Sequence, residues 1–339
     1  MVDVAGLRKQ FKVRPERFGA KPQVVHAVSD ISFKLAPGAT LGIVGESGCG
    51  KSTVARLLMG LIEADDGDVR MAGLHLSQRP DQLKAVRRKV QMVFQDSYAS
   101  LNPRMSIEAS IMFGPVVHGV PRDEARRTAH DLLARVGLEP TRFAGRYPHE
   151  VSGGQRQRVN IARALALKPE IVIFDEAVSA LDKSVEIQVL NLMQDLKAEF
   201  KLTYLFISHD LNVVQYISDQ VLVMYLGKIV EIGPVQDVYE RPAHPYTRAL
   251  LASMPSMDPE HRTLAPPIVG DPPSPIDPPS GCRFRTRCQF AADVCAASEP
   301  LLETFNEGNR IEHRVACHML KLPAGTWQPL VAMPSGVAE

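Results

Sequence analysis

The chain has 339 residues, more than one hydrophobic core usually supports, so we expect a main domain and an extension. Hydrophobic residues make up 45% of the sequence and charged residues 23%, as in an ordinary soluble globular protein. The formal net charge of +1 argues against a strongly basic surface, so we expect no nucleic-acid partner.

The N-terminal residues carry positive charge but lack the apolar run that a secretion signal requires. No stretch approaches the roughly 20 uninterrupted apolar residues of a membrane-spanning helix. Even the apolar segment VLVMYLGKIVEIG is interrupted by Gly227, Lys228 and Glu231. We therefore expect a cytoplasmic location, with any membrane role depending on a partner.

The first strands lead into a glycine-rich loop. Residues 24–35 alternate apolar and polar side chains, which predicts a strand with one solvent-facing side, and TLGIVG at 40–45 predicts a buried strand. The loop GESGCGKS follows at 45–52, and residues 54–62 are expected to form a helix. A strand, a glycine-rich loop and a helix in this order are the context that a phosphate-binding loop requires.

The glycines of this loop allow successive backbone N–H groups to converge on phosphate oxygens, and the helix after it adds the positive end of its dipole. Lys51 would reach the β- and γ-phosphates, and the Ser52 hydroxyl would ligate magnesium. An accidental glycine-rich turn is the alternative, which the flanking strand and helix disfavour. The expected nucleotide-binding residues of the loop are Gly45, Glu46, Ser47, Gly48, Cys49, Gly50, Lys51, Ser52 and Thr53.

A helical insert is predicted over residues 96–167, after a strand at 90–95, because 123–136 have the apolar spacing of an amphipathic helix. Within the insert, Ser152 is suited to cap a helix that runs to about residue 167. Read alone, this is only a capped helix, but exposed N–H groups at a helix start can bind an anion. Since the loop at 45–52 already supplies a phosphate site, we expect the second start to complete the site of another subunit. The residues concerned are Ser152, Gly153, Gly154 and Gln155.

Strand character resumes at IVIFDE (171–176), LTYLFISHD (202–210) and QVLVMYLGKIVEIG (220–233), with a helix over 183–200. Strands that alternate with helices predict a parallel sheet covered by helices, and hence an α/β fold. Asp175 ends an apolar strand, so its carboxylate would lie at the ligand-binding edge of the sheet.

Three polar side chains near this edge are candidates for chemistry. We expect Asp175 to hold magnesium and Glu176 to polarise an attacking water, a general-base role worth roughly 10²–10⁴-fold. His209 also follows an apolar strand, and its imidazole could hydrogen-bond the γ-phosphate and orient the water. The alternatives are a surface turn with two acids and a structural histidine; the preceding strands disfavour both.

Together these segments resemble the ATP-binding-cassette family over residues 7–239. The resemblance assigns 45–52 to Walker A, 151–155 to the signature, Asp175 and Glu176 to Walker B, and 179–182 to the D-loop. The implied fold is α/β, with a mixed phosphate-loop sheet, an antiparallel β subdomain and a helical subdomain. The resemblance also assigns Gln95 to the Q-loop, where it would contact magnesium and couple the magnesium site to the helical insert. It places Asp182 at the nucleotide and makes His209 the switch histidine. Phe11 would stack on adenine, with Phe18 as a competing choice.

The sequence departs from the family at Val151, where leucine is commoner in the signature, and at Ser97 and Ala177, where proline is usual. None of these removes a catalytic group. By resemblance, two such subunits enclose two ATP molecules, each Walker A facing the signature of the other subunit. Their closure would drive the permeases from inward-facing to outward-facing.

Four further stretches resemble the ATPase subunits of oligopeptide and dipeptide importers: 45–61, 92–105, RPAHPYT at 241–247 and CRFRTRC at 282–288. The resemblance implies ATP and Mg²⁺ as cofactors, a second ATPase subunit, two permeases and, indirectly, an external substrate-binding protein. The chain would then be peripheral, at the inner face of the cell membrane. A soluble cassette ATPase acting on nucleic acid or the ribosome, an exporter subunit, and an importer of nickel chelates or glutathione remain as alternatives.

Nine of the 26 prolines fall within 255–280, which predicts an extended linker between an ATPase domain at 1–254 and an extension at 281–339. Four cysteines follow the linker, and a cytoplasmic protein has little use for disulfides. Four thiolates suit a tetrahedral zinc ion or an iron–sulfur cluster, although their spacing is not that of paired C-x₂-C motifs. Some members of the subfamily that the chain resembles carry a [4Fe–4S] cluster on matching cysteines. The alternatives are free thiols, or a metal or redox sensor that controls ATP turnover. The cysteines are Cys282, Cys288, Cys295 and Cys317, with His313 and His318 as reserve ligands.

Overall fold

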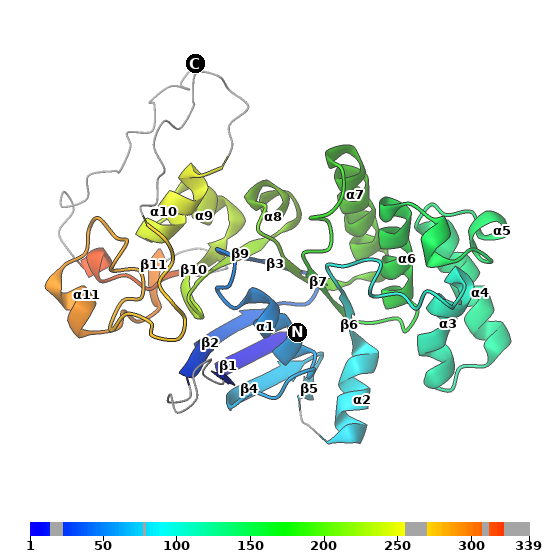
Figure 1. Ribbon diagram of the computed structural model, residues 1–339, viewed down its shortest axis with the longest axis horizontal. Coiled ribbons are helices and arrows are strands. Elements are labelled where there is room, and N and C mark those ends of the chain that lie inside the picture. Colours follow the sequence, from blue (N-terminus) through cyan, green and yellow to red (C-terminus); the bar gives the residue numbers. More distant parts are fainter. Residues whose placement is uncertain (14–22, 77–78, 255–269, 307–311, 322–339) are drawn as a thin grey trace, which may run out of the picture.

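The computed structural model describes residues 1–13, 23–76, 79–254, 270–306 and 312–321. Over these ranges the chain forms a large and a small β-sheet with helices around them (Figure 1). The architecture is that of an α/β protein, which confirms the predicted fold class.

The large sheet carries the segments predicted to be buried strands. Its strands are β3 (Thr40–Val44), β6 (Val90–Val93), β7 (Ile171–Asp175), β8 (Thr203–Ile207), β9 (Gln220–Tyr225), β10 (Lys228–Pro234), β11 (Glu303–Asn306) and β12 (His313–Val315). They lie in the order β11-β12-β10-β9-β3-β8-β7-β6. The five strands from β9 to β6 are parallel, and β10, β12 and β11 continue the sheet in antiparallel pairs.

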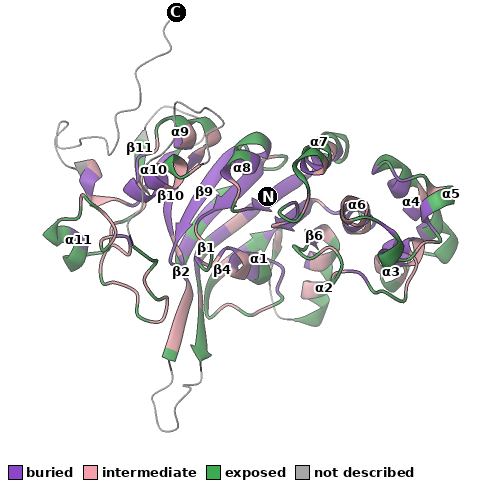
Figure 2. Cartoon of the chain, turned by 45° about the horizontal axis from the view of Figure 1, so that its top comes forward, coloured by how far each residue is buried: buried purple, intermediate pink, exposed green. Residues whose placement is uncertain are grey.

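The small sheet is antiparallel and contains the N-terminal strands. It consists of β1 (Val2–Val13), β2 (Gln23–Leu35), β4 (Asp66–Met71) and β5 (Leu74–His75), in the order β2-β1-β4-β5. At the ends that lie farthest from the large sheet, β1 is exposed and β2 is mostly half-buried, whereas the strands of the large sheet are mostly buried (Figure 2).

The predicted helical insert is present between β6 and β7, and its helices gather at one end of the molecule (Figure 1). They are α3 (Ile107–Val117), α4 (Arg122–Arg135), α5 (Pro140–Phe143), the 3-10 helix η1 (Pro148–Glu150) and α6 (Gly153–Leu165). The remaining helices are α1 (Lys51–Leu58), α2 (Pro80–Lys89), α7 (Lys183–Phe200), α8 (Leu211–Ile217), α9 (Val235–Glu240), α10 (Pro245–Ala252), α11 (Asp293–Ala297) and the 3-10 helix η3 (His318–Lys321).

Apolar clusters cover both faces of the large sheet, which explains why its strands are continuous apolar runs. Because successive side chains of a strand point to opposite faces, Val172 and Phe174 of β7 join the cluster that includes α6 and α7. Ile171 and Ile173 join the other cluster, which includes α1 and the small sheet. The sheet therefore forms a rigid base from which the ends of β3, β7 and β8 can present polar groups.

The described part of the extension continues the large sheet. Strand β12 pairs with β10, and the His313 Nε2 lies 2.7 Å from the Glu231 Oε1, with both side chains buried. Of the proline-rich linker, 255–269 lie outside the described residues, and 270–280 form neither helix nor strand. The Pro275 carbonyl accepts a hydrogen bond from the His26 N–H. The predicted domain limits at 254 and 280 stay predictions, but the extension packs on the ATPase body.

Candidate functional site

The predicted phosphate loop joins the end of β3 to the start of α1. Its glycines have positive φ angles, +148° at Gly45, +78° at Gly48 and +109° at Gly50. A Cβ at Gly45 would lie 2.2 Å from the Met224 carbonyl oxygen, so only glycine fits there. No side chain caps α1, so its first N–H groups are oriented to receive an anion. The predicted helix over 54–62 begins earlier, at Lys51, because Gly50 itself forms the N-cap.

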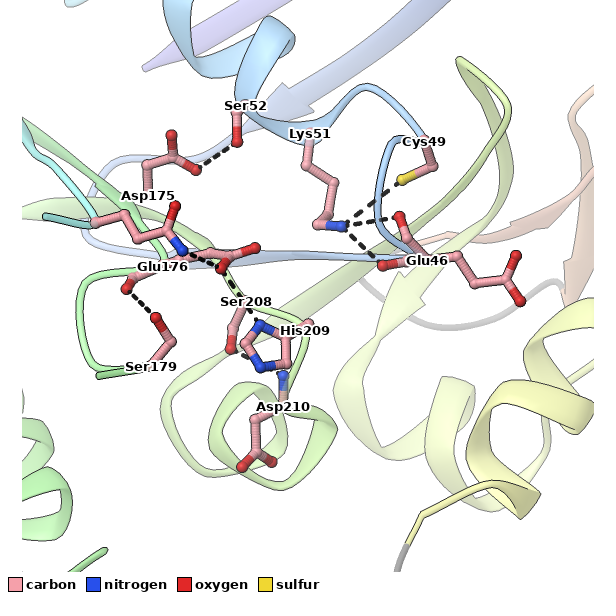
Figure 3. Close-up of polar contacts among 12 residues, drawn as sticks. Glu46, Cys49, Lys51, Ser52, Asp175, Glu176, Ser179, Ser208, His209 and Asp210 are labelled. Carbon is pink, nitrogen blue, oxygen red and sulfur yellow. Dashed lines mark hydrogen bonds and ion pairs between the residues drawn. The ribbon is translucent and has the colours of Figure 1, made fainter. Parts of the chain in front are cut away.

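Lys51 lies over this loop (Figure 3). Its ammonium group donates to the Gly45 carbonyl at 2.8 Å and to the Glu46 carbonyl at 3.1 Å, and it lies 3.9 Å from the Cys49 Sγ. The side chain is 5% exposed. These acceptors are neutral, and burial makes the positive charge a strong attractor for an anion in the loop.

A hydroxyl and a carboxylate meet beside Lys51. The Ser52 Oγ donates to the Asp175 Oδ1 at 2.9 Å, which joins the start of α1 to the end of β7. Asp175 is 7% exposed, and burial raises the pKa of its carboxyl despite this hydrogen bond. Mg²⁺ takes one or two protein oxygens together with waters and substrate phosphates, so this pair fits such an ion.

Glu176 follows with a left-handed backbone (φ +49°), which in a residue other than glycine costs roughly 1–3 kcal/mol. Its N–H donates to the Ile207 carbonyl of β8, and its carbonyl accepts from the Ser179 Oγ, both at 2.9 Å. These two bonds hold the backbone in this conformation, which turns the side chain away from the strand direction and into the site (Figure 3).

The structure brings together the three residues predicted to be catalytic. The Glu176 Oε2 accepts from the Gln95 Nε2 at 2.9 Å and lies 3.4 Å from the His209 Nδ1. The His209 side chain is 60% exposed, so it can reach a ligand. Next to it, Asp210 caps α8 by accepting from the Asn212 N–H, and it pairs with Lys183 at 2.7 Å. This fixes the loop that carries the histidine.

The signature residues begin helix α6, as predicted. Ser152 and Gln155 form a capping box, in which the Ser152 Oγ accepts from the Gln155 N–H at 3.3 Å and the Gln155 Oε1 accepts from the Ser152 N–H at 3.0 Å. A Cβ on Gly154 would lie 2.4 Å from the Val185 Cγ1, so α6 and α7 pack closely there. These contacts lie on the helical insert and α7, and not at the phosphate loop.

The other predicted site residues lie farther out. Phe11 is on β1 and half exposed, with the Lys9 Nζ 5.6 Å from its ring centroid, and Phe18 lies outside the described residues. Asp182 is exposed at the N-cap position of α7, where its side chain makes no capping hydrogen bond. Ser47 and Gly48 are exposed at the top of the loop, and Thr53 is half-buried in the first turn of α1.

The arrangement of the cysteines in the extension gives no support to the predicted metal centre. Within the described ranges, no three His, Cys, Asp or Glu side chains are grouped so that they could hold a metal ion. Burial raises the pKa of Cys288 to about 11 and that of Cys317 to about 12, and the charges of neighbouring cysteines add to both shifts. The proposed reserve ligands are also engaged, His313 with Glu231 and His318 with the Ser298 carbonyl.

Sequence reasoning missed two residues that hold the phosphate loop. Arg287 forms a bidentate ion pair with Glu46, and the Tyr246 hydroxyl accepts from the Glu46 N–H at 2.8 Å. Both lie in segments that were noted only for their resemblance, 241–247 and 282–288. The sequence shows an arginine next to Cys288, but its partner Glu46 lies 241 residues earlier in the chain, so no local pattern links the two.

Comparison with protein families gives two matches. The family described as ABC transporter matches residues 28–179. The family described as the oligopeptide/dipeptide transporter C-terminal region matches residues 230–295. The first match falls on the ATPase body, and the second includes three of the four cysteines of the extension, Cys282, Cys288 and Cys295.

Relatives match along nearly the whole chain. The oligopeptide transport ATP-binding protein OppF of Escherichia coli is 47% identical, over 94% of this chain and 95% of its own length. The oligopeptide transport ATP-binding protein AppF of Bacillus subtilis is 48% identical, over 94% and 97%. A probable peptide ABC transporter ATP-binding protein, y4tS of Sinorhizobium fredii, is also 48% identical, over 94% and 90%.

Solved structures agree on the cassette. The structure of cbiO1 from Clostridium perfringens, part of an ABC transporter complex, has a TM-score of 0.62 and 25% identity, over 71% of this chain and 90% of its own. The ATP-binding cassette MJ0796, solved as a dimer bound to ADP and phosphate, has a TM-score of 0.61 and 26% identity, over 69% and 99%. The chain therefore belongs to the ABC transporter family, among the ATP-binding subunits that carry the oligopeptide/dipeptide transporter C-terminal region.

Proposed function

We propose that this chain binds and hydrolyses ATP with Mg²⁺, as the subunit that energises peptide import through an ABC transporter. The observation that carries the proposal is the position of Glu176 between Gln95 and His209, next to the Ser52–Asp175 pair. Membership of the family of transport ATP-binding subunits supports the same activity.

Each residue then has a chemical role. Lys51 and the N–H groups at the start of α1 bind the phosphates, and Ser52 and Asp175 hold Mg²⁺, which neutralises developing negative charge when bound. Glu176 polarises the attacking water, because its carboxylate is fixed by Gln95 and faces the phosphate loop. His209 orients the γ-phosphate and that water. Phe11 is proposed to stack on adenine.

The signature supports a site shared between two subunits. The start of α6 contacts the helical insert and α7, and we expect the N–H groups of Gly153 and Gly154 at this helix start to bind the nucleotide of a partner. The cassette MJ0796 was solved as a dimer. The partner here is a second ATPase subunit, either a copy of this chain or a related chain, and Asp182 lies at the contact between them.

Transport requires two permease subunits and, on the other side of the membrane, a substrate-binding protein. No helix in the described part of the chain has the length and apolarity that crossing a membrane requires. We place the chain at the inner face of the membrane, as a peripheral subunit bound to its permeases. This location follows from the family and stays a proposal.

Peptides are the substrate class that the relatives favour, since several with 46–48% identity carry oligopeptide or dipeptide transport in their names. A glutathione import ATP-binding protein, GsiA of Pectobacterium atrosepticum, is 52% identical, but this chain covers 45% of its length. Glutathione is therefore the second candidate. The [4Fe–4S] cluster on Cys282, Cys288, Cys295 and Cys317 stays a prediction of resemblance alone, and iron and acid-labile sulfide analysis of anaerobically purified protein would test it.

The direct test is release of inorganic phosphate by the chain reconstituted with its permeases. We expect release that requires magnesium and that Lys51→Ala abolishes, together with nucleotide binding measured by calorimetry. Arg122→Ala, at the start of α4 on the helical insert, serves as a control that removes a cation elsewhere. Unchanged nucleotide affinity in Lys51→Ala would contradict the assignment of the phosphate loop.

A further inference from the structure

The C-terminal extension reaches into the phosphate loop through one arginine. The Arg287 Nη1 donates to the Glu46 Oε2 at 2.8 Å, and the Nη2 donates to the Glu46 Oε1 at 3.1 Å. The Arg287 side chain is 7% exposed. A bidentate arginine–carboxylate pair of this kind fixes both distance and direction, and solvent screens it little at this burial.

A second contact holds the same residue by its backbone. The Tyr246 hydroxyl, from the fully buried side chain on α10, accepts from the Glu46 N–H at 2.8 Å. The Arg287 Nη1 also reaches the Tyr225 hydroxyl of β9 at 3.4 Å. The first residue after Gly45 is thus clamped at its backbone and at its carboxylate by groups that follow the family's catalytic motifs in sequence.

The segment that carries Arg287 is packed against the ATPase body. Phe284, three residues earlier and buried, has its ring centroid 5.2 Å from that of Tyr225 and 5.4 Å from that of Tyr246. Arg283 donates to the Leu226 carbonyl and to the Ser29 Oγ, so it ties the same segment to β2. Such a support restricts the arginine to one position before a ligand arrives, and a preorganised group loses less entropy on binding.

The negative charge of Glu46 explains why a contact with Arg287 would matter for nucleotide binding. Its carboxylate belongs to the proposed phosphate loop, and a negative charge there would repel the negatively charged phosphates of a nucleotide. The ion pair compensates that charge and turns the carboxylate toward the extension. The hydrogen bond to Tyr246 keeps the loop backbone in place.

We propose that Arg287 is a positioning residue for nucleotide: it neutralises and orients Glu46, so that the C-terminal extension sets the nucleotide affinity of the phosphate loop. This rests on the proposed nucleotide site. The extension thereby acts on ATP binding in its own subunit, through a contact made within one chain.

Calorimetric titration of the full chain with MgADP tests the proposal. Without the arginine, the Glu46 carboxylate would be left uncompensated and would repel the incoming phosphates, so we expect Arg287→Ala to raise the Kd about tenfold. In the reconstituted transporter, KM for ATP should rise by a similar factor with a smaller change in kcat. Arg285→Ala is the matched control, since Arg285 lies in the same segment but bonds to Ser280. Its Kd should stay at the wild-type value.

A double-mutant cycle tests whether the arginine acts through Glu46. In the Glu46→Gln background no carboxylate remains to be neutralised, so Arg287→Ala should change the Kd less than about threefold. An equal change in both backgrounds would overturn the proposal. If Arg287→Ala does not fold, Arg287→Gln together with Glu46→Gln gives a neutral hydrogen-bonded pair, which should bind MgADP more tightly than Arg287→Gln alone.

Two outcomes separate the role of Arg287 from the assignment of the phosphate loop. A wild-type Kd in Arg287→Ala, with nucleotide binding still lost in Lys51→Ala, would overturn the role of Arg287 and leave the phosphate loop assigned. A rise in Kd that Arg285→Ala reproduces would show a general effect on the extension, and would likewise overturn it.

Discussion

His244 gives the fold a specific sensitivity to acid. The side chain is buried at the start of α10, and its Nδ1 accepts a hydrogen bond from the Tyr246 N–H at 3.0 Å, so the ring must be neutral at that nitrogen. Burial lowers the pKa of His244 from 6.5 to about 4, against the opposing effect of the nearby Glu231 carboxylate. Protonation would place a charge in the interior and remove the acceptor.

The sign and size of the effect follow from linkage. Between about pH 4 and 6.5 the unfolded chain binds the His244 proton and the folded chain does not, so stability is complete above about pH 6.5 and is lost as the pH falls. At about 1.36 kcal/mol per pH unit, this interval corresponds to a loss of roughly 3 kcal/mol in the free energy of unfolding.

The measurement compares urea unfolding of the wild type and of His244→Asn at several values from pH 7.5 to 4.5. Asparagine keeps a side-chain acceptor for the Tyr246 N–H but cannot be protonated in this range. Other groups titrate equally in both proteins, so the difference in slope belongs to His244. We expect the wild type to lose roughly 2–3 kcal/mol more than the variant, and parallel slopes would refute the reasoning.

Two further predictions concern the catalytic carboxylate and the start of α6. Glu176→Gln should still bind MgATP in calorimetry, and it should retain a nucleotide-bound dimer in size-exclusion chromatography. Its release of phosphate should fall at least 10²-fold, because general-base action is lost. Turnover at the wild-type rate would show that Glu176 is not the general base. Gly154→Ala should lower the free energy of unfolding in urea by about 1–3 kcal/mol, because its Cβ would lie 2.4 Å from the Val185 Cγ1. Gly114→Ala on α3 is the matched control, since its Cβ would lie 3.5 Å from Leu167, an ordinary contact, and a loss of stability equal to that of Gly154→Ala would contradict the packing argument.

The central sheet could be predicted from sequence because local patterns determine it. The apolar runs at 171–175 and 203–207 form β7 and β8, and the helix expected between them has the predicted bounds, 183–200. Asp175, Glu176 and His209 follow such runs directly, so the parallel strands bring them to one edge. Local sequence was enough to place most of the site.

The features that could not be predicted from sequence depend on contacts between distant segments of the chain. Strand β12 has only the residues His313–Val315, too few for a periodic pattern, and its position is set by pairing with β10 and by Glu231. The left-handed backbone of Glu176 depends on its hydrogen bond to the Ile207 carbonyl of β8 and on the one it accepts from Ser179. The pair between Glu46 and Arg287 likewise exists only once the chain is folded.

The pairing of β12 with β10 protects an otherwise open margin of the protein. Strand β10 is buried along nearly its whole length, and β12 pairs with its outer side at Glu231 and Ile232. Without the extension, the backbone groups at this edge of the sheet would face water or a neighbouring molecule, the situation in which unpaired strands associate and aggregate. We therefore expect that removal of β12 would leave the catalytic residues in place but lower the solubility of the protein.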